Sequence, residues 1–237
     1  MKTAMRTIAR RALAVAGQVS SPANQTYEFG RAVAFRRLKI DAVLDVGANS
    51  GQYAKALRHE GFAEHIVSIE PLPAAFESLR QAMENDLKWS GYQVAAGEEA
   101  SIAKFNVSID SVCSSLLQPT HELTAAIPSA KIAETIDVPV ARLDDLAMPT
   151  YKRLAIKIDV QGFEKQAIAG ATNLLSEALL LELELPLTPS YQGAYLLQDA
   201  IPHILERGFK ITSIGRGYSD PNTGSLVDVD VLFERAI

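Results

Sequence analysis

Short apolar runs alternate with stretches of helical periodicity over most of this chain. Runs of strand length cover residues 41–46, 65–69, 92–96, 102–109, 138–140, 154–160 and 178–185. Stretches with helical character cover residues 50–61, 73–86, 163–175 and 196–207. This alternation predicts an α/β fold in which helices cover both faces of a mostly parallel sheet.

The last two apolar runs, 209–214 and 227–233, are connected differently from the others. The loop between them, from Gly215 to Gly224, is rich in Gly, Asp, Pro and Asn and is too short for a covering helix. We therefore expect these two strands to form an antiparallel hairpin at the edge of the sheet, an arrangement that mixed sheets tolerate.

Two helices are expected before the first strand, over residues 4–17 and 22–37. The second has Pro22 near its start, and apolar residues follow at near-helical spacing, namely Phe29, Val33 and Leu38. We treat residues 1–39 as a helical extension or cap and residues 40–237 as the main domain. The first residues weakly resemble a signal peptide, but Arg10 and Arg11 interrupt the apolar run, so we expect the segment to be retained.

Charge divides the chain at the same boundary. Residues 1–39 contain one acid, Glu28, and eight basic residues, which are Lys2, Arg6, Arg10, Arg11, Arg31, Arg36, Arg37 and Lys39. The extension therefore carries +7, which leaves −12 for the rest of a chain whose net charge is −5. A basic arm can dock on anionic lipid, on phosphate groups or on nucleic acid, whereas the alternative is a solvated helix face beside an acidic domain.

Composition excludes several protein classes. With 237 residues, 48% hydrophobic and 22% charged, the chain fits one globular domain with an extension. The single cysteine, Cys113, excludes an internal disulfide framework and a cysteine-based zinc site, and it fits a reducing compartment. We find no uninterrupted apolar run long enough for a membrane-spanning helix and no metal-binding motif, and we expect a cytoplasmic protein.

A loop of small residues follows the first strand of the main domain. In the segment from Asp45 to Gly51, Gly47 and Gly51 permit close approach of a ligand to the backbone, and the next helix begins directly afterwards. The spacing is not that of a phosphate-binding loop. The segment therefore indicates a ligand site at the end of this strand, and the alternative is a purely structural turn.

Carboxylates end two other strands. Glu70 follows strand 65–69, at a distance from the glycine loop where an acid typically accepts hydrogen bonds from ribose hydroxyls, although it could instead favour a helix N-terminus. Asp159 ends strand 154–160, and alternation places Lys157 on the same face of the strand. A structural ion pair of Lys157 with Asp159 or Glu182 is the alternative to a catalytic role.

These segments together resemble the FkbM family of S-adenosylmethionine-dependent methyltransferases. The matching segments are Asp45–Gln52, Ile69–Pro71, Ser114–Leu116, Lys157–Glu164 with Gly170, Leu181–Leu187 with Tyr191, Gly208–Phe209 and Val229–Phe233. They cover roughly residues 40–235 in the order of the family. The resemblance implies a class I, Rossmann-like methyltransferase fold with a seven-stranded sheet.

The resemblance also implies a function and a set of roles. It implies methyl transfer from S-adenosylmethionine to an oxygen, often a hydroxyl of a sugar, a glycosylated natural product or a glycolipid. The residues expected around the cofactor are Asp45, Gly47, Asn49, Gly51, Glu70 and Ser115. Asp159 is the first candidate for a general base, supported by Lys157, with Glu182 and then Glu184 as further candidates. The serine pair could equally be a plain turn, and His121 is a less favoured base.

Two departures from the family pattern bear on the site. Many members carry Glu where this chain has Gln161, which removes a carboxylate next to Asp159. The segment Leu187–Tyr191 is longer than the compact form expected there, which puts transfer of the acceptor by analogy in doubt.

Other functions remain open at this point. N-methylation, or a non-catalytic module that binds S-adenosylmethionine or a nucleoside, would use the same fold. A nucleic-acid methyltransferase is disfavoured because the main domain is acidic and the aromatic content is only 7%. We expect a small-molecule or glycolipid acceptor, with peripheral contact of the basic extension to the inner face of a membrane, and no nucleic-acid partner.

Overall fold

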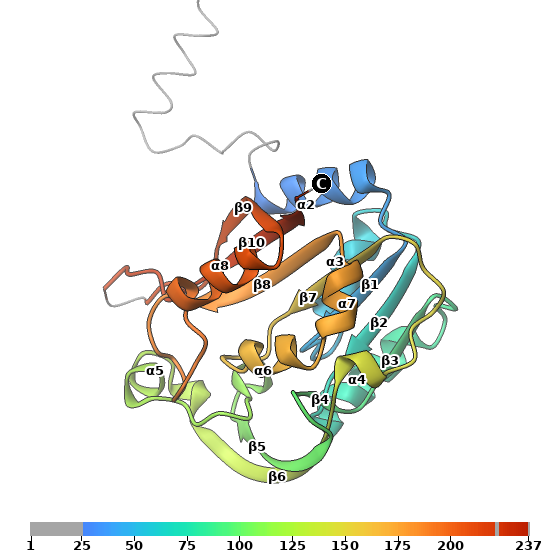
Figure 1. Ribbon diagram of the computed structural model, residues 1–237. Coiled ribbons are helices and arrows are strands. Elements are labelled where there is room, and N and C mark those ends of the chain that lie inside the picture. Colours follow the sequence, from blue (N-terminus) through green and yellow to red (C-terminus); the bar gives the residue numbers. More distant parts are fainter. Residues whose placement is uncertain (1–25, 221–222, 237) are drawn as a thin grey trace, which may run out of the picture.

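The computed structural model describes residues 26–220 and 223–236. The expected helix over residues 4–17 lies outside these ranges, as do Lys2, Arg6, Arg10 and Arg11. Within them, one α/β unit is built around a seven-stranded sheet (Figure 1).

The seven strands follow the order β3-β2-β1-β7-β8-β10-β9. Their bounds are β1 Ala42–Val46, β2 His65–Ile69, β3 Trp89–Tyr92, β7 Leu154–Ile158, β8 Leu180–Pro186, β9 Phe209–Arg216 and β10 Asp228–Arg235. Neighbouring strands from β3 to β8 are parallel, and β10 runs antiparallel to both β8 and β9. The predicted seven-stranded, mostly parallel sheet with a C-terminal hairpin at its edge is confirmed.

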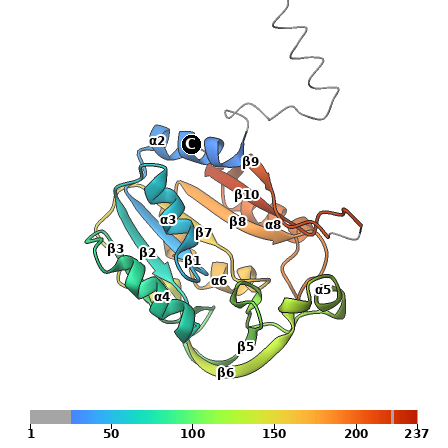
Figure 2. The same cartoon turned by 180° about the vertical axis from the view of Figure 1, so that it is seen from behind.

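Helices cover both faces of this sheet (Figures 1 and 2). One face is covered by α2 Tyr27–Leu38, α3 Gln52–His59 and α4 Pro73–Met83. The other is covered by α6 Glu164–Ala169, α7 Thr172–Glu177 and α8 Leu197–Glu206. None of the helices in the described ranges is long and apolar enough to cross a bilayer.

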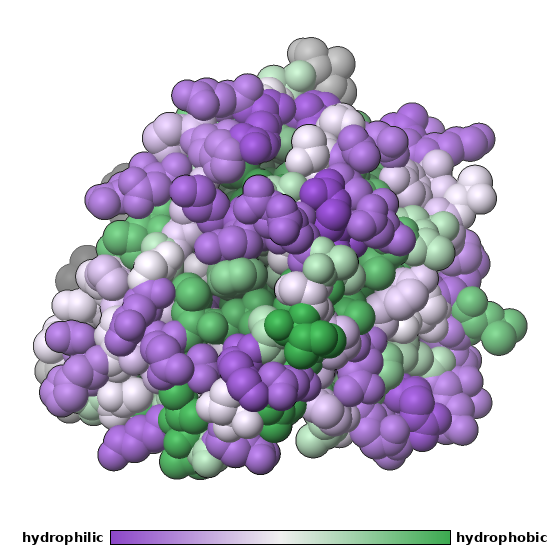
Figure 3. Space-filling model, turned by 60° about the horizontal axis from the view of Figure 1, so that its bottom comes forward, coloured by the Kyte–Doolittle hydropathy of each residue, from purple (hydrophilic) through white to green (hydrophobic). Residues whose placement is uncertain are grey.

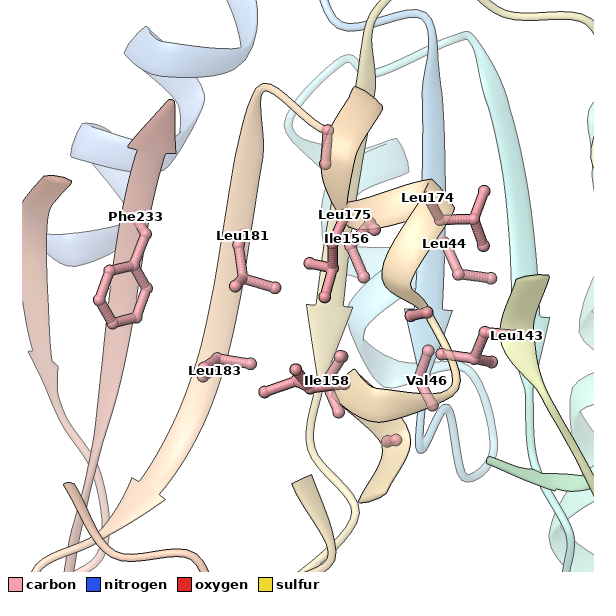
Figure 4. Close-up of a cluster of buried hydrophobic side chains, with 14 of the residues drawn as sticks. Leu44, Val46, Leu143, Ile156, Ile158, Leu174, Leu175, Leu181, Leu183 and Phe233 are labelled. Carbon is pink, nitrogen blue, oxygen red and sulfur yellow. The ribbon is translucent and has the colours of Figure 1, made fainter. Parts of the chain in front are cut away.

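The core on the α6–α8 face consists of aliphatic side chains from the central strands. Ile156 and Ile158 of β7 lie beside Leu181 and Leu183 of β8, with Phe233 of β10 next to them (Figure 4). Strands buried on both faces need near-continuous apolar sequence, and the run Leu154–Ile158 supplies it except at Lys157. Lys157 is the one polar residue in that run. It therefore marks a place on the α2–α4 face of the sheet where the buried side chains are not all apolar.

A second, three-stranded sheet lies at the carboxyl ends of the main strands. Its order is β4-β6-β5, with β4 Ala95–Ala96, β5 Ser101–Ser108 and β6 Ile132–Ala141. Between β5 and β6 lie the short helices η2 Ser111–Cys113, α5 His121–Ala126 and η3 Pro128–Ala130, and η4 Leu143–Asp145 follows β6. The expected strand 102–109 thus exists, but it belongs to this second sheet, and the expected strand 138–140 is the end of a ten-residue strand.

Two elements differ in their bounds from the sequence-based expectations. The third main-sheet strand is Trp89–Tyr92, before the expected 92–96, because Trp89 and not an apolar run fills the position against α3 and α4. The expected helix 163–175 is two helices. They break at Gly170, where a Cβ would lie 1.9 Å from the carbonyl oxygen of Gly97. That close approach of two backbones explains the break.

The orientation of α2 also differs from its expected apolar face. Phe29 and Val33 are exposed, and the buried side chains are Arg31, Ala34, Phe35 and Leu38. Arg31 turns inward because it forms ion pairs with Glu60 and Glu182, at 2.6 and 3.3 Å. It is therefore not part of an exposed basic surface.

We expect Leu183→Ala to lower the free energy of unfolding by ~2–5 kcal/mol, because it removes a fully buried side chain from the centre of the core. The matched control is Leu87→Ala, since Leu87 is fully exposed, and we expect a change within about 0.5 kcal/mol there. Urea unfolding followed by circular dichroism measures both; equal effects of the two variants would contradict the assigned core.

Candidate active site

The glycine loop connects β1 to α3 and passes against the end of β7. Gly47 has φ +81°, and a Cβ there would lie 1.7 Å from the carbonyl oxygen of Asp159, so only glycine fits. Gly51 has φ +86° and caps α3, with the Trp89 ring 2.9 Å from where its Cβ would be. Asn49 also has a positive φ, +46°, which asparagine tolerates better than most residues. The backbone N–H groups of Gly47 and Ala48 both donate to the Ile69 carbonyl, so these conformations hold the loop against the ends of β2 and β7.

Glu70 lies beside this loop. Its two carboxylate oxygens accept hydrogen bonds from the backbone N–H groups of Asn49 and Leu72, both at 2.8 Å. Burial raises the pKa of Glu70 to about 7, although these N–H groups favour its ionised form. A carboxylate offers about four acceptor sites, so capacity remains for hydroxyl donors from a ligand.

A row of polar side chains crosses the sheet on the face covered by α2 and α3. Strand pairing aligns Asp45 of β1 with Lys157 of β7, and Lys157 with Glu182 of β8. The Lys157 ammonium group lies 3.1 Å from an Asp159 carboxylate oxygen and 3.8 Å from one of Asp45. Burial would lower the pKa of Lys157, but the charges of Asp159 and Asp45 outweigh it and raise the pKa.

Asp159, Gln161 and Glu184 form one hydrogen-bonded group. The Gln161 side-chain amide donates to Asp159 at 2.9 Å and to Glu184 at 2.7 Å. Burial would raise the pKa of Asp159, but Lys157 and the Gln161 hydrogen bond hold it below its usual value. Burial and the charge of Asp159 raise the pKa of Glu184 well above its usual range. Lys157 and Gln161 thus favour the ionised form of Asp159, while burial beside Asp159 favours the protonated form of Glu184.

Glu182 has a different environment from Asp159. One of its carboxylate oxygens accepts a hydrogen bond from Arg31, and the other accepts one from the Tyr53 hydroxyl at 2.7 Å. Both oxygens are engaged by residues of α2 and α3. The contacts of Glu182 therefore hold two helices against the sheet, and Asp159 is the carboxylate with the freer access to a ligand.

The serine loop and His121 take separate positions. The Ser115 hydroxyl is buried and donates to the backbone carbonyl of Gln161 at 2.8 Å, so this side chain fixes the loop after β7 and does not face the cavity described below. The Ser114 hydroxyl accepts a hydrogen bond from the backbone N–H of Ser108 at 3.0 Å, and Ser114 does line that cavity. His121 begins α5, is exposed and belongs neither to the lining of this cavity nor to the group of carboxylates around Lys157.

A cavity of about 340 Å³ brings most of these residues together, within the usual size range of ligand pockets. Its polar walls include Gly47, Asn49, Glu70, Lys157, Asp159, Glu182 and Asp230. Its apolar walls include Ile69, Val94, Ala95, Phe105, Leu116 and Phe163. Figure 3 views the molecule from the end where the second sheet lies, and hydrophobic surface there is bordered by hydrophilic residues. Asp45 and Gly51 lie behind the walls and shape them.

Several cavity residues were not predicted as site residues. Tyr27 and Arg31 reach it from α2, Tyr53 from α3 and Asp230 from β10. Burial raises the pKa of Asp230 to about 6, with the charge of Glu182 adding to the effect. Nothing in the sequence marked Arg31 as buried, because an arginine in a helix normally faces solvent. In residues 26–220 and 223–236, no group of three or more His, Cys, Asp or Glu side chains is arranged to hold a metal ion.

Comparisons with known proteins identify a family whose model matches this chain. A family model described as the methyltransferase FkbM domain matches residues 45–211, more than half of the chain. No curated protein matches the chain. The match spans the glycine loop, Glu70, Lys157, Asp159 and Glu184.

Solved methyltransferases are similar at low identity. Magnesium protoporphyrin IX methyltransferase (ChlM) from Synechocystis PCC 6803 with bound S-adenosylmethionine is 15% identical, over 97% of this chain and 96% of that chain, with a TM-score of 0.49. A putative RNA methyltransferase, PH1948 from Pyrococcus horikoshii, is 15% identical over 93% and 88%, with a TM-score of 0.47. N-methyltransferase NodS from Bradyrhizobium japonicum WM9 is 11% identical over 89% and 97%, also with 0.47.

We expect Glu164→Gln to make stability less dependent on pH. One Glu164 oxygen accepts from the N–H groups of Val160 and Gly162, and burial raises its pKa to about 7 from an ordinary 4.5. The folded state thus binds the Glu164 proton more tightly than the unfolded state does. The contribution of this proton to the free energy of unfolding is therefore fully present below pH 4.5 and is lost as the pH rises through 7. Relative to the variant, wild type should lose as much as ~3 kcal/mol across that window.

Urea unfolding at pH 5 and pH 8 measures this difference. The exposed Glu122→Gln is the matched control, because its carboxyl group lies in solvent in both states. A Glu164→Gln effect that is the same at both pH values would contradict the burial of a titrating carboxyl group.

Proposed function

Because this chain belongs to the FkbM methyltransferase family, we propose that it methylates a hydroxyl oxygen, on a sugar ring of a natural product or glycolipid. Family membership makes it an S-adenosylmethionine-dependent methyltransferase. The choice of oxygen is the proposed part. It is supported above all by Asp159, a carboxyl group at the wall of the cavity whose pKa is held below its usual value, because such a group is able to accept a hydroxyl proton.

The residues of the cavity fit S-adenosylmethionine. Gly47 and Asn49 line the cavity beside Glu70, which offers acceptor capacity for ribose hydroxyls. The apolar walls around Ile69, Val94 and Phe105 suit an adenine ring. The surrounding carboxylates suit the positive charge of a sulfonium.

The α2 wall fits the amino-acid end of the cofactor. Arg31 Nε and the Tyr27 hydroxyl are buried and lack hydrogen-bond partners among the described residues, and both residues line the cavity. Such orphaned donors are costly, and a ligand carboxylate would satisfy them. Glu182 and Asp230 on the same wall suit the ammonium group. We propose in this way that residues 26–39 act as a cap which closes one side of the site.

When bound, S-adenosylmethionine supplies an electrophilic methyl group, whose bond to sulfur breaks with the electron pair remaining on sulfur. Asp159 orients the acceptor hydroxyl and takes its proton. The lowered pKa of Asp159 does not prevent this, because a hydroxyl proton becomes strongly acidic as its oxygen forms a third bond. Lys157 keeps Asp159 ionised, and the cavity walls hold the reacting groups in place, which is worth up to about 7–11 kcal/mol in well-oriented systems.

Calorimetry with S-adenosylhomocysteine tests the cofactor site. We expect Glu70→Ala to weaken binding roughly tenfold or more, because it removes hydrogen bonds from a charged acceptor. The variant also leaves the Asn49 and Leu72 N–H groups unpaired, so its thermal stability is measured in parallel. Absence of binding to the folded wild-type protein would contradict the proposal.

Asp159→Asn tests the proposed base. We expect kcat to fall ~10²–10⁴-fold, because the amide cannot accept the proton, while S-adenosylhomocysteine affinity is retained. Turnover is measured by mass spectrometry of methylated glycosides, and the exposed Asp137→Asn is the matched control. Preferential methylation of amines by wild type, with little effect of Asp159→Asn, would favour N-methylation instead.

We also propose that the protein is cytoplasmic and contacts the inner face of a membrane through its N-terminal extension. Support comes from the charge of residues 1–39 and from α2, where Phe29 and Val33 are exposed near the exposed Arg36 and Arg37. We expect removal of residues 1–20 to weaken binding to anionic vesicles and to raise the KM for a glycolipid acceptor. Unchanged values of both in a sedimentation and kinetic assay would refute this role.

A further inference from the structure

A second cavity, of about 360 Å³, lies on the other side of the loop that follows β7. It is bounded by η2 and α5, by the end of β8 and by the connection between β9 and β10. Asp159, Gln161 and Val112 line both cavities. The hydrogen-bonded group of Asp159, Gln161 and Glu184 is therefore the partition between them.

Tyr191 holds this partition in place. Its hydroxyl lies 3.0 Å from the Gln161 side-chain oxygen and donates to the backbone carbonyl of Cys113 at 2.8 Å. Gln161 itself has φ +54°, a conformation that non-glycine residues seldom adopt. Because Asp159 itself lines the second cavity, a ligand there has direct access to the carboxylate that we assign as proton acceptor.

The walls of the second cavity have a distinct chemistry. Its carboxyl groups belong to Asp110, Asp159, Glu164, Glu184 and Asp228, and none of its lining residues is Lys or Arg. Its less polar walls include Leu123, Ile127, Pro186, Val227, Tyr191 and Tyr218. Carboxyl groups accept from hydroxyl or ammonium donors, and apolar or aromatic walls pack against the C–H faces of a ring. The ionised carboxylates among these groups would repel an anionic ligand, and no Lys or Arg side chain lines this cavity to offset the repulsion.

One buried oxygen atom in the wall of the second cavity lacks a hydrogen-bond donor among the described residues. Glu164 is 1% exposed and lines the cavity, yet its Oε2 accepts no hydrogen bond from the described residues. A buried carboxylate oxygen without a donor is unfavourable, and a ligand hydroxyl would supply one.

We propose that the second cavity binds the acceptor as an uncharged or amino-bearing polyhydroxylated ring, and that it excludes phosphorylated sugars and nucleotide sugars. This assignment rests on the proposed O-methyltransferase function and adds to it the place and the charge class of the acceptor. The ring lies between the apolar walls, and the hydroxyl to be methylated reaches Asp159 at the partition.

Cys113 provides a readout that is independent of turnover. It is the only cysteine of the chain, is partly buried and lines the second cavity but not the first. Burial raises the pKa of its thiol to about 11, so alkylation is slow and its rate is measured by mass spectrometry at mildly alkaline pH. A ligand in the second cavity should shield the thiol.

The experiment alkylates the full-length protein with N-ethylmaleimide in the presence of methyl hexosides, octyl glucoside, glucosamine, mannose 6-phosphate or a nucleotide sugar. We expect a neutral or amino glycoside to slow the reaction about tenfold at ten times its dissociation constant. We expect the phosphorylated compounds to give no protection. S-adenosylhomocysteine binding is measured in the same samples by calorimetry.

Tyr218→Ala and Asp228→Asn locate the effect. Both residues line only the second cavity, and the asparagine keeps the side-chain oxygen that accepts from the Tyr218 backbone N–H. We expect each variant to weaken glycoside protection roughly tenfold with S-adenosylhomocysteine affinity unchanged, whereas Asp145→Asn, on an exposed side chain, changes neither.

The outcomes separate the two proposals. If S-adenosylhomocysteine binds but no neutral or amino glycoside shields Cys113 up to its solubility limit, or if a sugar phosphate shields it better, the acceptor assignment is wrong and the proposed function stands. If S-adenosylhomocysteine does not bind to the folded protein, the proposed function itself fails.

Discussion

The buried face of the sheet depends on the ion pairs that the Lys157 ammonium group forms. Asp45 and Asp159 both lie within 4 Å of it, and Glu184 and Glu182 follow on the neighbouring strand. Removing one partner from such a group leaves an uncompensated buried charge, which typically costs several kcal/mol. Lys157 stands at this one position of β7 in place of an apolar side chain. Because of it, a charged site can exist inside an otherwise aliphatic sheet. The carboxylates stay close together because the Lys157 ammonium group lies between Asp45 and Asp159 and because burial favours the protonated form of Glu184.

The main sheet could be predicted because its strands are apolar runs buried on both faces. The third strand was predicted at the wrong position, because Trp-Ser-Gly-Tyr contains no such run. Gly91 is required in it because a Cβ there would lie 2.8 Å from the Ser68 carbonyl oxygen. The second sheet was missed as a unit because β6 is largely exposed and has no strong periodic signal. Short-range pattern predicted elements well, but it could not assign β5 to one sheet or the other.

The site residues were likewise predictable only where a short-range sequence pattern marked them. The glycine loop, Glu70, Lys157 and Asp159 were predictable because ligands in open α/β folds bind beyond the carboxyl ends of the strands. Arg31 was not, since its partner Glu182 lies 151 residues away and a helix arginine normally faces solvent. The Gln161 bridge was equally hidden, because it depends on a positive φ and on a tyrosine thirty residues later. Long-range pairing and backbone conformation, not residue type, decided these contacts.

Gln161 has a consequence for the path of protons. A carboxamide neither gains nor loses a proton at physiological pH, and its two ends have fixed roles: the nitrogen donates to Asp159 and Glu184, and the oxygen faces the Tyr191 hydroxyl. The side chain thus insulates the carboxyl pair from Tyr191 and, beyond it, from the loop of Cys113. A glutamate at this position would be able to carry a proton between the same partners, whereas the carboxamide is not. In this chain the contact between the carboxyl pair and Tyr191 therefore offers no titratable link along which a proton could move.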